Sequence, residues 1–435
     1  MPKISLKSLM RLLDSILSPP PDYSISTYEN QLKKLWAGCF TKNGSRARKI
    51  LYFLRLGSMM SASYILYPVA YILQKNGYRF STIDLAQIGS VIYLDLFLRE
   101  DILYKKTPRY KILLLASSYR DGNRYILNLY NEYAIFIRNP FLKFILSPFF
   151  VSPLFKEDNS FKFDLTYPTE IAAHKIWNTY KNKYHKPLIS FPDKDVNIAQ
   201  EQLKKFIPNN QKFIALHVRD NGFYNISSQN TRNADIQTYL PAIKYLIDQG
   251  YAIIRLGDHN MVDISNMVEI CGNMLFDYAH ADIQSEMMDA YILSHCEFYI
   301  GLASGPASIP MLFGINSVNV NWYNVSNAPN FLKGDLTTFK IFKYKENDEL
   351  VPFEQLFHKP FNSNPTQSIL DHHGIYFCDN SEENILSTVK EFIEEPKLPS
   401  EKQILAHNKI LDSNYAYGAN GHFSNTILNY YNFKR

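Results

Sequence analysis

The chain has few cysteines, and their spacing excludes several classes of protein. Its 435 residues include four cysteines, and no two of them form a Cys-x-x-Cys pair. This pattern indicates neither a zinc site nor a redox motif, and it gives no disulfide framework. A reducing compartment is therefore expected. The four are Cys39, Cys271, Cys296 and Cys378.

Long apolar runs are also missing. No stretch approaches the roughly 18 apolar residues that a membrane-spanning helix needs. Lys3, Lys7 and Arg11 interrupt the first apolar segment, which argues against a signal peptide. These absences predict a cytoplasmic protein.

Neither sign of charge dominates. Lys and Arg together number 46 and Asp and Glu 41, which gives a formal net charge of +5. So mild an excess of positive charge suits an anionic small ligand or a membrane surface, and it does not indicate binding to nucleic acid. Hydrophobic residues make up 46% of the chain, enough for filled cores, and the length predicts two or three domains.

Three ligand-binding motifs are missing where they would be expected. The N-terminal part has no G-x-G-x-x-G, which disfavours a dinucleotide-dependent enzyme such as an epimerase. No Gly-Lys-Ser/Thr follows the glycine turn at 304–308, so that turn is not a Walker loop. The segment Arg232–Gln237 has no Asp-x-Asp, so a metal bridged by paired carboxylates is not indicated and no metal is expected.

Alternating strand and helix patterns are what the sequence does contain. Over residues 206–325 each short apolar run ends in polar residues, and most lead into a helical stretch, which predicts a doubly wound, mostly parallel sheet. Residues 46–155 alternate in the same way. The runs are KFIALHVRD, YAIIRLGD, NMLFDYA, EFYIGLASG and INSVNVNW, from Lys212 to Trp322.

Composition divides the chain into four predicted segments. They are an N-terminal extension (1–45), a Rossmann-like domain with its connector (46–205), a second Rossmann-like domain (206–390) and a helical tail (391–435). Residues 5–17 of the extension follow a helical period with basic residues off the apolar stripe. Such a helix can lie on a membrane surface or dock on its own domain.

Polar residues follow the strands of the second domain at their carboxyl ends, where open parallel sheets bind ligands. We expect these side chains to gather at one edge of the sheet. Arg255 and Asp258 can form an internal pair, and Asp277 can accept from ribose hydroxyls or cap a turn. Asp235 precedes a helix, so N-capping is its expected role. The candidates for donor binding are His217, Arg219, Arg255, Asp258, Asp277, Tyr278, Ser304, Gly305 and Ser308.

The turn from Ser304 to Ser308 has two interpretations. Gly305 permits close backbone approach and Pro306 suits a first helical turn, so free N–H groups there can bind a phosphate. The alternative is an ordinary strand-to-helix turn capped by Ser304.

The segment after the first strand offers two roles for each residue. Arg219 can clamp a diphosphate with its planar fork or form a surface salt bridge. His217 can contact ligand or be structural. Asp220 can act as general base toward an acceptor hydroxyl, provided that it lies within hydrogen-bond reach.

Four segments in this order resemble a bacterial glycosyltransferase family of capsule and surface-polysaccharide loci. They begin LHVRDNGFYN, TRNADIQTYLP, FDYAHADIQ and SVNVNW, and the resemblance is most specific over His217–Trp322. The family is similar to GT-B fucosyltransferases, which carry a His-x-Arg motif at a strand end. In the weaker upstream match Ser90 stands where the family often has His, so an acceptor-side role there does not carry over.

The resemblance implies a GT-B-like architecture of two Rossmann-like domains facing a central cleft, with the tail crossing back to the first domain. It places His217 and Arg219 at the donor diphosphate and the 304–308 turn at the nucleotide. Those relatives usually work without a metal. Asp220 replaces the second Arg of some fucosyltransferase motifs.

Together these observations predict a metal-independent glycosyltransferase that uses a nucleotide-sugar donor and a glycan or lipid-linked glycan acceptor, with Arg219 and Asp220 as catalytic residues. Peripheral contact with the inner membrane would run through residues 5–17. The alternative is a non-catalytic glycan-binding or assembly subunit of the same fold. Such a subunit would lose the charged strand ends that this chain retains.

Overall fold

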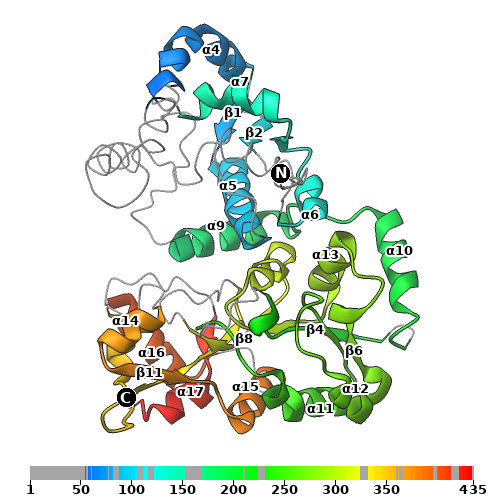
Figure 1. Ribbon diagram of the computed structural model, residues 1–435, viewed down its shortest axis with the longest axis vertical. Helices are drawn as coiled ribbons and strands as arrows, with labels where there is room; N and C mark the ends of the chain where they lie inside the picture. The colour runs from blue at the N-terminus through cyan, green and yellow to red at the C-terminus, as the bar shows by residue number, and fades with distance from the viewer. Residues whose placement is uncertain are drawn as a thin grey trace, which may run out of the picture. The chain divides into compact units, whose positions relative to one another are not determined.

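The computed structural model divides the chain into two compact units, residues 1–164 and 165–435 (Figure 1). Each unit has its own parallel sheet, so the predicted α/β class is confirmed. The four-segment division remains a prediction, and the predicted helix at 5–17 lies outside the described residues. The structure describes residues 54, 57–59, 61–76, 78–81, 88–104, 111–115, 122–151, 169–208, 211–223, 231–323, 332–358, 361, 366–394, 399–412 and 421–433.

The N-terminal unit is built on a three-stranded parallel sheet in the order β1-β2-β3. The alternation predicted over residues 46–155 is present in its described part, where the helix at Val91–Tyr104 is followed by the strand at Lys111–Leu115. No described helix is both long and apolar enough to cross a membrane. The elements are α4 (Tyr67–Lys75), β1 (Tyr78–Ser81), η1 (Ile88–Ser90), α5 (Val91–Tyr104), β2 (Lys111–Leu115), α6 (Arg124–Leu129), β3 (Ala134–Ile137) and α7 (Pro140–Val151).

A buried ion pair connects α5 to the end of α6. Arg99 Nε lies 2.5 Å from Asp95 Oδ2, and the Tyr130 hydroxyl donates to Asp95 Oδ1 over 2.9 Å. All three side chains are fully buried. Because a buried carboxylate must be paired and hydrogen-bonded, this cluster fixes the packing of the two helices.

The C-terminal unit carries a seven-stranded sheet in the order β12-β9-β8-β7-β4-β5-β6, with every pair parallel. A separate antiparallel pair joins β10 to β11. The strands are β4 (Phe213–His217), β5 (Ala252–Arg255), β6 (Leu275–Asp277), β7 (Tyr299–Gly301), β8 (Ser317–Trp322), β9 (Leu336–Phe339), β10 (Ile341–Tyr344), β11 (Ile375–Cys378) and β12 (His422–Phe423).

Helices cover this sheet and follow its strands, as the alternating patterns predict. Asp235 accepts from Gln237 N over 2.9 Å and so caps the turn before α11, as expected. The Ser285 side chain caps α13. The helices are α9 (Thr169–Tyr184), α10 (Asp193–Leu203), η4 (Ile236–Tyr239), α11 (Leu240–Asp248), α12 (Ser265–Cys271), α13 (Glu286–His295), α14 (Gln367–His372), α15 (Glu382–Glu394), α16 (Glu401–Asp412) and α17 (Asn425–Tyr430).

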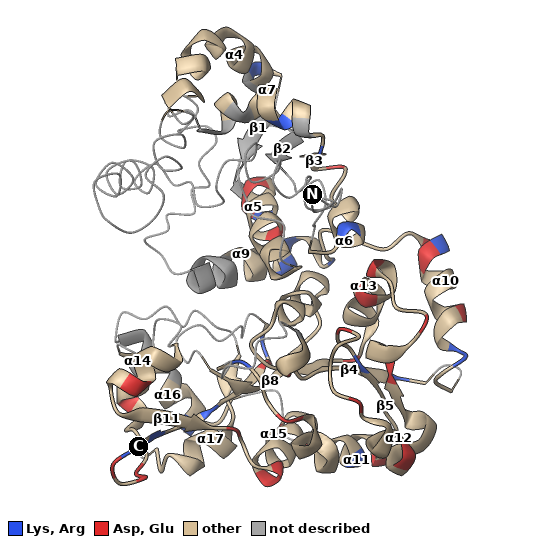
Figure 2. Cartoon of the chain, viewed as in Figure 1, with Lys and Arg blue, Asp and Glu red and all other residues tan. Residues whose placement is uncertain are grey.

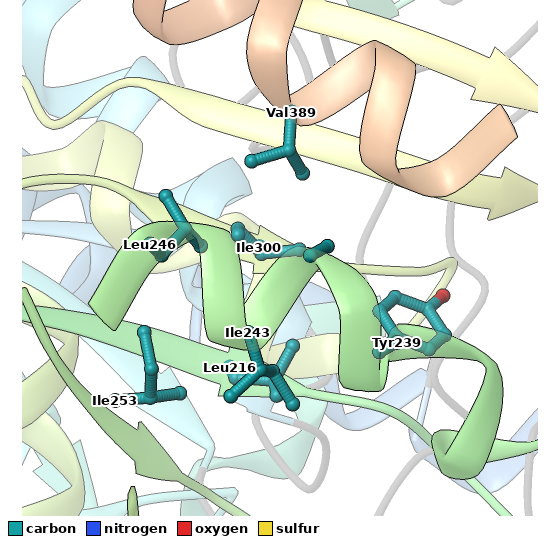
Figure 3. A pocket seen from close by; sticks show the side chains of 8 residues that line it. Leu216, Tyr239, Ile243, Leu246, Ile253, Ile300 and Val389 are labelled. Atoms are coloured by element: carbon teal, nitrogen blue, oxygen red, sulfur yellow. The ribbon is translucent and has the colours of Figure 1, made fainter. Parts of the chain in front are cut away.

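One face of the large sheet forms the main apolar core. Alternate residues of β4, β7 and β8, such as Leu216, Ile300 and Val318, pack against α11 and α15. A small cavity inside this core has wholly apolar surroundings except for the Tyr239 hydroxyl (Figure 3). A lining of this kind suits no charged nucleotide, so the cavity is a packing feature rather than a ligand site.

Five strands were predicted for this sheet and correspond to β4 to β8. The sequence patterns missed β9 and β12, which extend the sheet beyond β8. The tail was expected to cross back to the first domain. That crossing remains a prediction, and the described residues of the tail are assigned to the C-terminal unit, where β12 pairs with β9 and α17 packs against α15. The tail therefore helps to build this unit.

Candidate functional site

The predicted site residues lie at the carboxyl ends of four adjacent strands. His217 ends β4, Arg255 ends β5, Asp277 ends β6, and the turn at Ser304 follows β7. These strands are neighbours in the order β7-β4-β5-β6. The parallel topology therefore brings the polar strand ends to one edge, as the sequence predicts.

Asp220 connects the loops that follow β4 and β5. Its Oδ1 accepts from Gly222 N and its Oδ2 from Val262 N, each over 2.8 Å. Gly222 packs so closely that a Cβ there would lie 1.8 Å from Asn260 O. The two loops are thus held together by one carboxylate and one glycine, a structural role for Asp220 that the sequence did not indicate.

Arg255 is the buried centre of an ion-pair chain. Its Nη1 donates to Asp277 Oδ1 over 2.9 Å, and its Nη2 lies 3.8 Å from Asp220 Oδ2. Asp277 Oδ2 lies 2.7 Å from His280 Nδ1, which raises the pKa of the imidazole. The expected Arg255–Asp258 pair was wrong, because Asp258 accepts from Asn260 instead. Asp277 is occupied in orienting Arg255.

His217 is buried in a positive environment. Burial, followed by the charges of Arg255 and Arg219, lowers the pKa of His217 to about 3. The imidazole is therefore neutral at physiological pH and cannot supply a proton. Among the described residues its Nδ1 has no hydrogen-bond partner. The same two charges that depress this pKa favour an anion nearby.

Arg219 follows β4 and is 4% exposed. Its carbonyl accepts from Ala234 N over 3.0 Å, which ties it to the segment before η4. After burial and the charge of Arg255, its positive charge is a further cause of the lowered pKa of His217. A guanidinium held at the end of a strand has little rotamer freedom left to lose when it binds an anion.

The turn after β7 is tighter than expected. Gly305–Ser308 and Pro310–Phe313 form two short 3-10 helices, not the predicted α-helix. Ser304 occupies the N-cap position, but its side chain makes no capping bond, so the alternative of a turn capped by the Ser304 side chain was wrong. A four-residue 3-10 turn has little dipole, so any anion here would be bound by local amides and hydroxyls.

A row of residues beneath this edge was not predicted. His217, Gly301 and Asn319 lie in register across β4, β7 and β8. The Tyr299 ring lies against Gly301, where a Cβ would be 2.2 Å from the hydroxyl. Glycine is therefore needed at 301. Alternation along a strand signals burial but not this cross-strand row, which only the register reveals.

Lys340, which directly follows β9, is a further residue that the sequence did not single out. It is 1% exposed, its Nζ donates to Asn233 O over 2.7 Å, and it pairs with Asp379. Burial lowers its pKa. The lysine fastens the segment before η4 to the carboxyl edge of the sheet.

Tyr278 donates to Asp289 Oδ1 over 2.7 Å and accepts from Ser285 N. Its hydroxyl therefore holds the start of α13, and its predicted donor contact remains a prediction. Burial raises the pKa of Asp289 to about 6. Within the described part of the chain, no three His, Cys, Asp or Glu side chains group closely enough to hold a metal ion.

Comparisons with known proteins give no family. No family model matches the sequence, and a search of curated proteins finds no match. Three solved structures are similar in chain path. A glycosyl transferase family 9 protein from Veillonella parvula shares 14% identity at a TM-score of 0.44, covering 73% of this chain and 97% of its own.

The other two are heptosyltransferases. E. coli WaaC, solved with ADP, shares 10% identity at a TM-score of 0.34, covering 60% of this chain and 89% of its own. The dodecameric, iron-containing TibC, solved with ADP-D-beta-D-heptose, shares 14% identity at a TM-score of 0.33. The match covers 77% of this chain and 75% of TibC.

The loop contact at Gly222 is testable. Gly222→Ala should lower the free energy of unfolding by about 1–3 kcal/mol, because the new methyl group would overlap the Asn260 backbone. Urea denaturation measures the change. Gly57→Ala is the matched control, since a Cβ there meets nothing within 4 Å. Equal stability of the two variants would contradict the contact.

The raised pKa of Asp289 predicts a pH effect. The folded pKa of about 6 exceeds the ordinary 3.8, so the folded chain takes up this proton first as the pH falls. As the pH falls from about 7.5 to about 4, the free energy of unfolding of wild type should therefore rise by about 2–3 kcal/mol relative to that of Asp289→Asn. Urea midpoints across this range, with exposed Asp282→Asn as control, measure it. A difference that does not vary with pH would exclude the shift.

Proposed function

We propose that the chain is a glycosyltransferase of GT-B type that transfers a sugar from a nucleotide-sugar donor to a hydroxyl of a surface-glycan acceptor. One observation carries the proposal. His217 and Arg219, at the end of β4, adjoin the strand that leads into the Ser304–Ser308 turn, and two buried arginines make the surroundings of the imidazole positive. The sequence resemblance over His217–Trp322 supports the same reading.

The donor diphosphate would lie at this edge. Arg219 would hold two phosphate oxygens with its fork, and Gly305 with the hydroxyls of Ser304 and Ser308 would bind the neighbouring oxygens. Negative charge develops on the leaving nucleotide as the glycosidic bond breaks. Groups already fixed before the reaction stabilise that charge without reorganising.

Arg255 would act from beneath the site. Its ion pairs with Asp277 and Asp220 hold the two loops that border the diphosphate. His217, neutral at physiological pH, would donate or accept a hydrogen bond without carrying charge. Tyr278 and Asp258 border the same edge and are proposed to contact the nucleoside.

An acceptor hydroxyl would attack the anomeric carbon of the donor sugar. We assign Asp220 as the base that removes its proton, in addition to its bonds to the loop amides. The acceptor would be a capsule, O-antigen or similar glycan, free or lipid-linked, reached from the cytoplasmic side. The reaction would need no metal, because Arg219 and the turn neutralise the diphosphate.

Nucleotide binding tests the donor site. A thermal-shift screen of UDP-, GDP-, CMP- and ADP-sugars and their free nucleotides, with and without chelator, should give a shift with one nucleotide class that chelator does not change. Arg219→Lys should weaken binding about 10- to 100-fold. Lysine keeps the charge but loses one of the two charge-assisted hydrogen bonds of the guanidinium, and such a bond is worth about 1.5–3 kcal/mol. Isothermal titration measures this affinity.

Lys212→Ala is the matched control for this variant. Lys212 lies at the opposite end of β4, is 66% exposed, and pairs at the surface with Glu297, so its loss removes a charge without touching the edge. Binding should be unchanged. If Arg219→Lys binds as wild type does, the donor site is wrong. If no nucleotide binds wild type, the non-catalytic subunit becomes the better reading.

A variant of Asp220 can distinguish its proposed role as general base from its role in holding the loops. Asp220→Asn should lower kcat by about 10²–10⁴-fold with little change in donor affinity, since loss of a general base costs that much. Single-turnover transfer and donor titration give the two quantities. A variant that loses stability and donor affinity together, but keeps kcat at saturating donor, would show that Asp220 only fastens the loops.

A further inference from the structure

The N-terminal unit exposes the apolar sides of two helices. More than half of the large apolar side chains that are exposed in the described residues lie in residues 64–72 and 141–145. Ile65 is 79% exposed, Phe141 69% and Ile72 59%. We call this surface, residues 64–72 and 141–145, the α4–α7 face.

The two helices of this face are neighbours. Ala70 of α4 and Phe149 of α7 belong to one buried cluster with Ile137 of β3. Figure 1 shows α4 and α7 next to each other beside β1. Because the inner sides of both helices are used in this cluster, the exposed apolar side chains form the outer side of the pair.

The pattern on α7 reverses that of an ordinary surface helix. Lys143 is fully buried, whereas Phe141, Leu142, Phe144 and Ile145 are exposed. A helix on a soluble domain normally turns its charged side to water and its apolar side to the core. Soluble monomers rarely expose contiguous apolar patches beyond about 300–600 Å², and larger ones mark partner or membrane surfaces.

Charge and aromatic content favour a lipid surface over a protein. Residues 61–76 and 138–151 contain no Asp or Glu, and in Figure 2 neither helix has an acidic segment. Lys75 ends α4 with its ammonium 5.4 Å from the Tyr71 ring. It is the basic residue of this face, because Arg138 before α7 lies over the Phe136 ring with Nη2 buried. Basic residues attract anionic headgroups, and tyrosine rings lie at the headgroup level of bilayers.

We propose that the α4–α7 face rests on the surface of an anionic lipid bilayer. The tyrosines and Lys75 would contact the headgroups, while Ile65, Ile72, Phe141 and Phe144 enter the acyl boundary. This contact goes beyond the proposed function and uses a surface other than residues 5–17. That it would hold the enzyme where a lipid-linked acceptor is found rests on the proposed function, whereas the lipid contact itself does not.

Co-sedimentation of the full chain with vesicles tests the proposal. Wild type should bind phosphatidylglycerol–phosphatidylcholine vesicles and bind pure phosphatidylcholine vesicles more weakly. Ile72→Asp and Phe144→Asp should each lower the partition coefficient about tenfold or more, because each places a charge at a position that would enter the acyl boundary of the bilayer. Ile270→Asp on α12 of the other unit, 54% exposed in wild type, is the matched control and should bind as wild type.

Three results would overturn the proposal. Both variants could bind vesicles as tightly as wild type, or a deletion of residues 5–17 could abolish binding while both variants retain it. Finally, wild type could fail to bind vesicles and sediment as a dimer while both variants sediment as monomers. That result would show that a second copy of the chain covers the face. Nucleotide thermal shifts, measured without vesicles, test the donor site separately and distinguish its failure from failure of the lipid contact.

Discussion

The buried charge of Arg255 is the constraint on which the carboxyl edge of the large sheet depends. A fully buried guanidinium has to be paired, and its partners come from two other strands, Asp277 as the last residue of β6 and Asp220 from the loop after β4. Asp220 in turn accepts from the backbone of both neighbouring loops. One buried charge thus determines how the segments after β4, β5 and β6 lie relative to one another.

The same pairing separates the tasks of the two arginines. Arg255 has its charge offset by carboxylates, whereas Arg219 follows β4, the strand beside β7, and its charge contributes to the positive environment of His217. A site that binds a diphosphate needs both kinds of residue, because a ligand-binding cation is useful only when its surroundings are fixed in advance. The neutral state of His217 follows from this environment and limits it to hydrogen bonding.

Much of the C-terminal unit could be predicted from the sequence, because five adjacent strands of its sheet, β4 to β8, are short apolar runs that end in polar residues. The edge that collects His217, Arg219, Arg255 and Asp277 follows directly from parallel topology. Pairings could not be predicted in this way. Arg255 was matched with Asp258, its near neighbour in sequence, but the strand order puts Asp277 closer. The tight approach of Gly222 to Asn260 and the row beneath the edge likewise depend on register.

Local pattern also failed where strands are short or half polar. β9 contains two threonines and β12 has two residues, so neither resembles a strand until its partner is known. On α7 nearly every residue is apolar, so the sequence does not tell which side faces water. Burial of Lys143 with exposure of Phe141 and Phe144 emerges only from the packing of the helix. Packing within the N-terminal unit does not explain why these apolar side chains of α7 are exposed.

Hydrogen exchange with and without a bound nucleotide tests the central claim most directly, that the carboxyl edge of the large sheet binds the donor diphosphate. Mass spectrometry should show increased protection at residues 217–223, 256–262 and 302–309 together, because these segments come from three neighbouring strands that share the edge. The amino ends of the same strands should not change. Protection confined to other segments, at nucleotide concentrations that saturate binding, would contradict the claim.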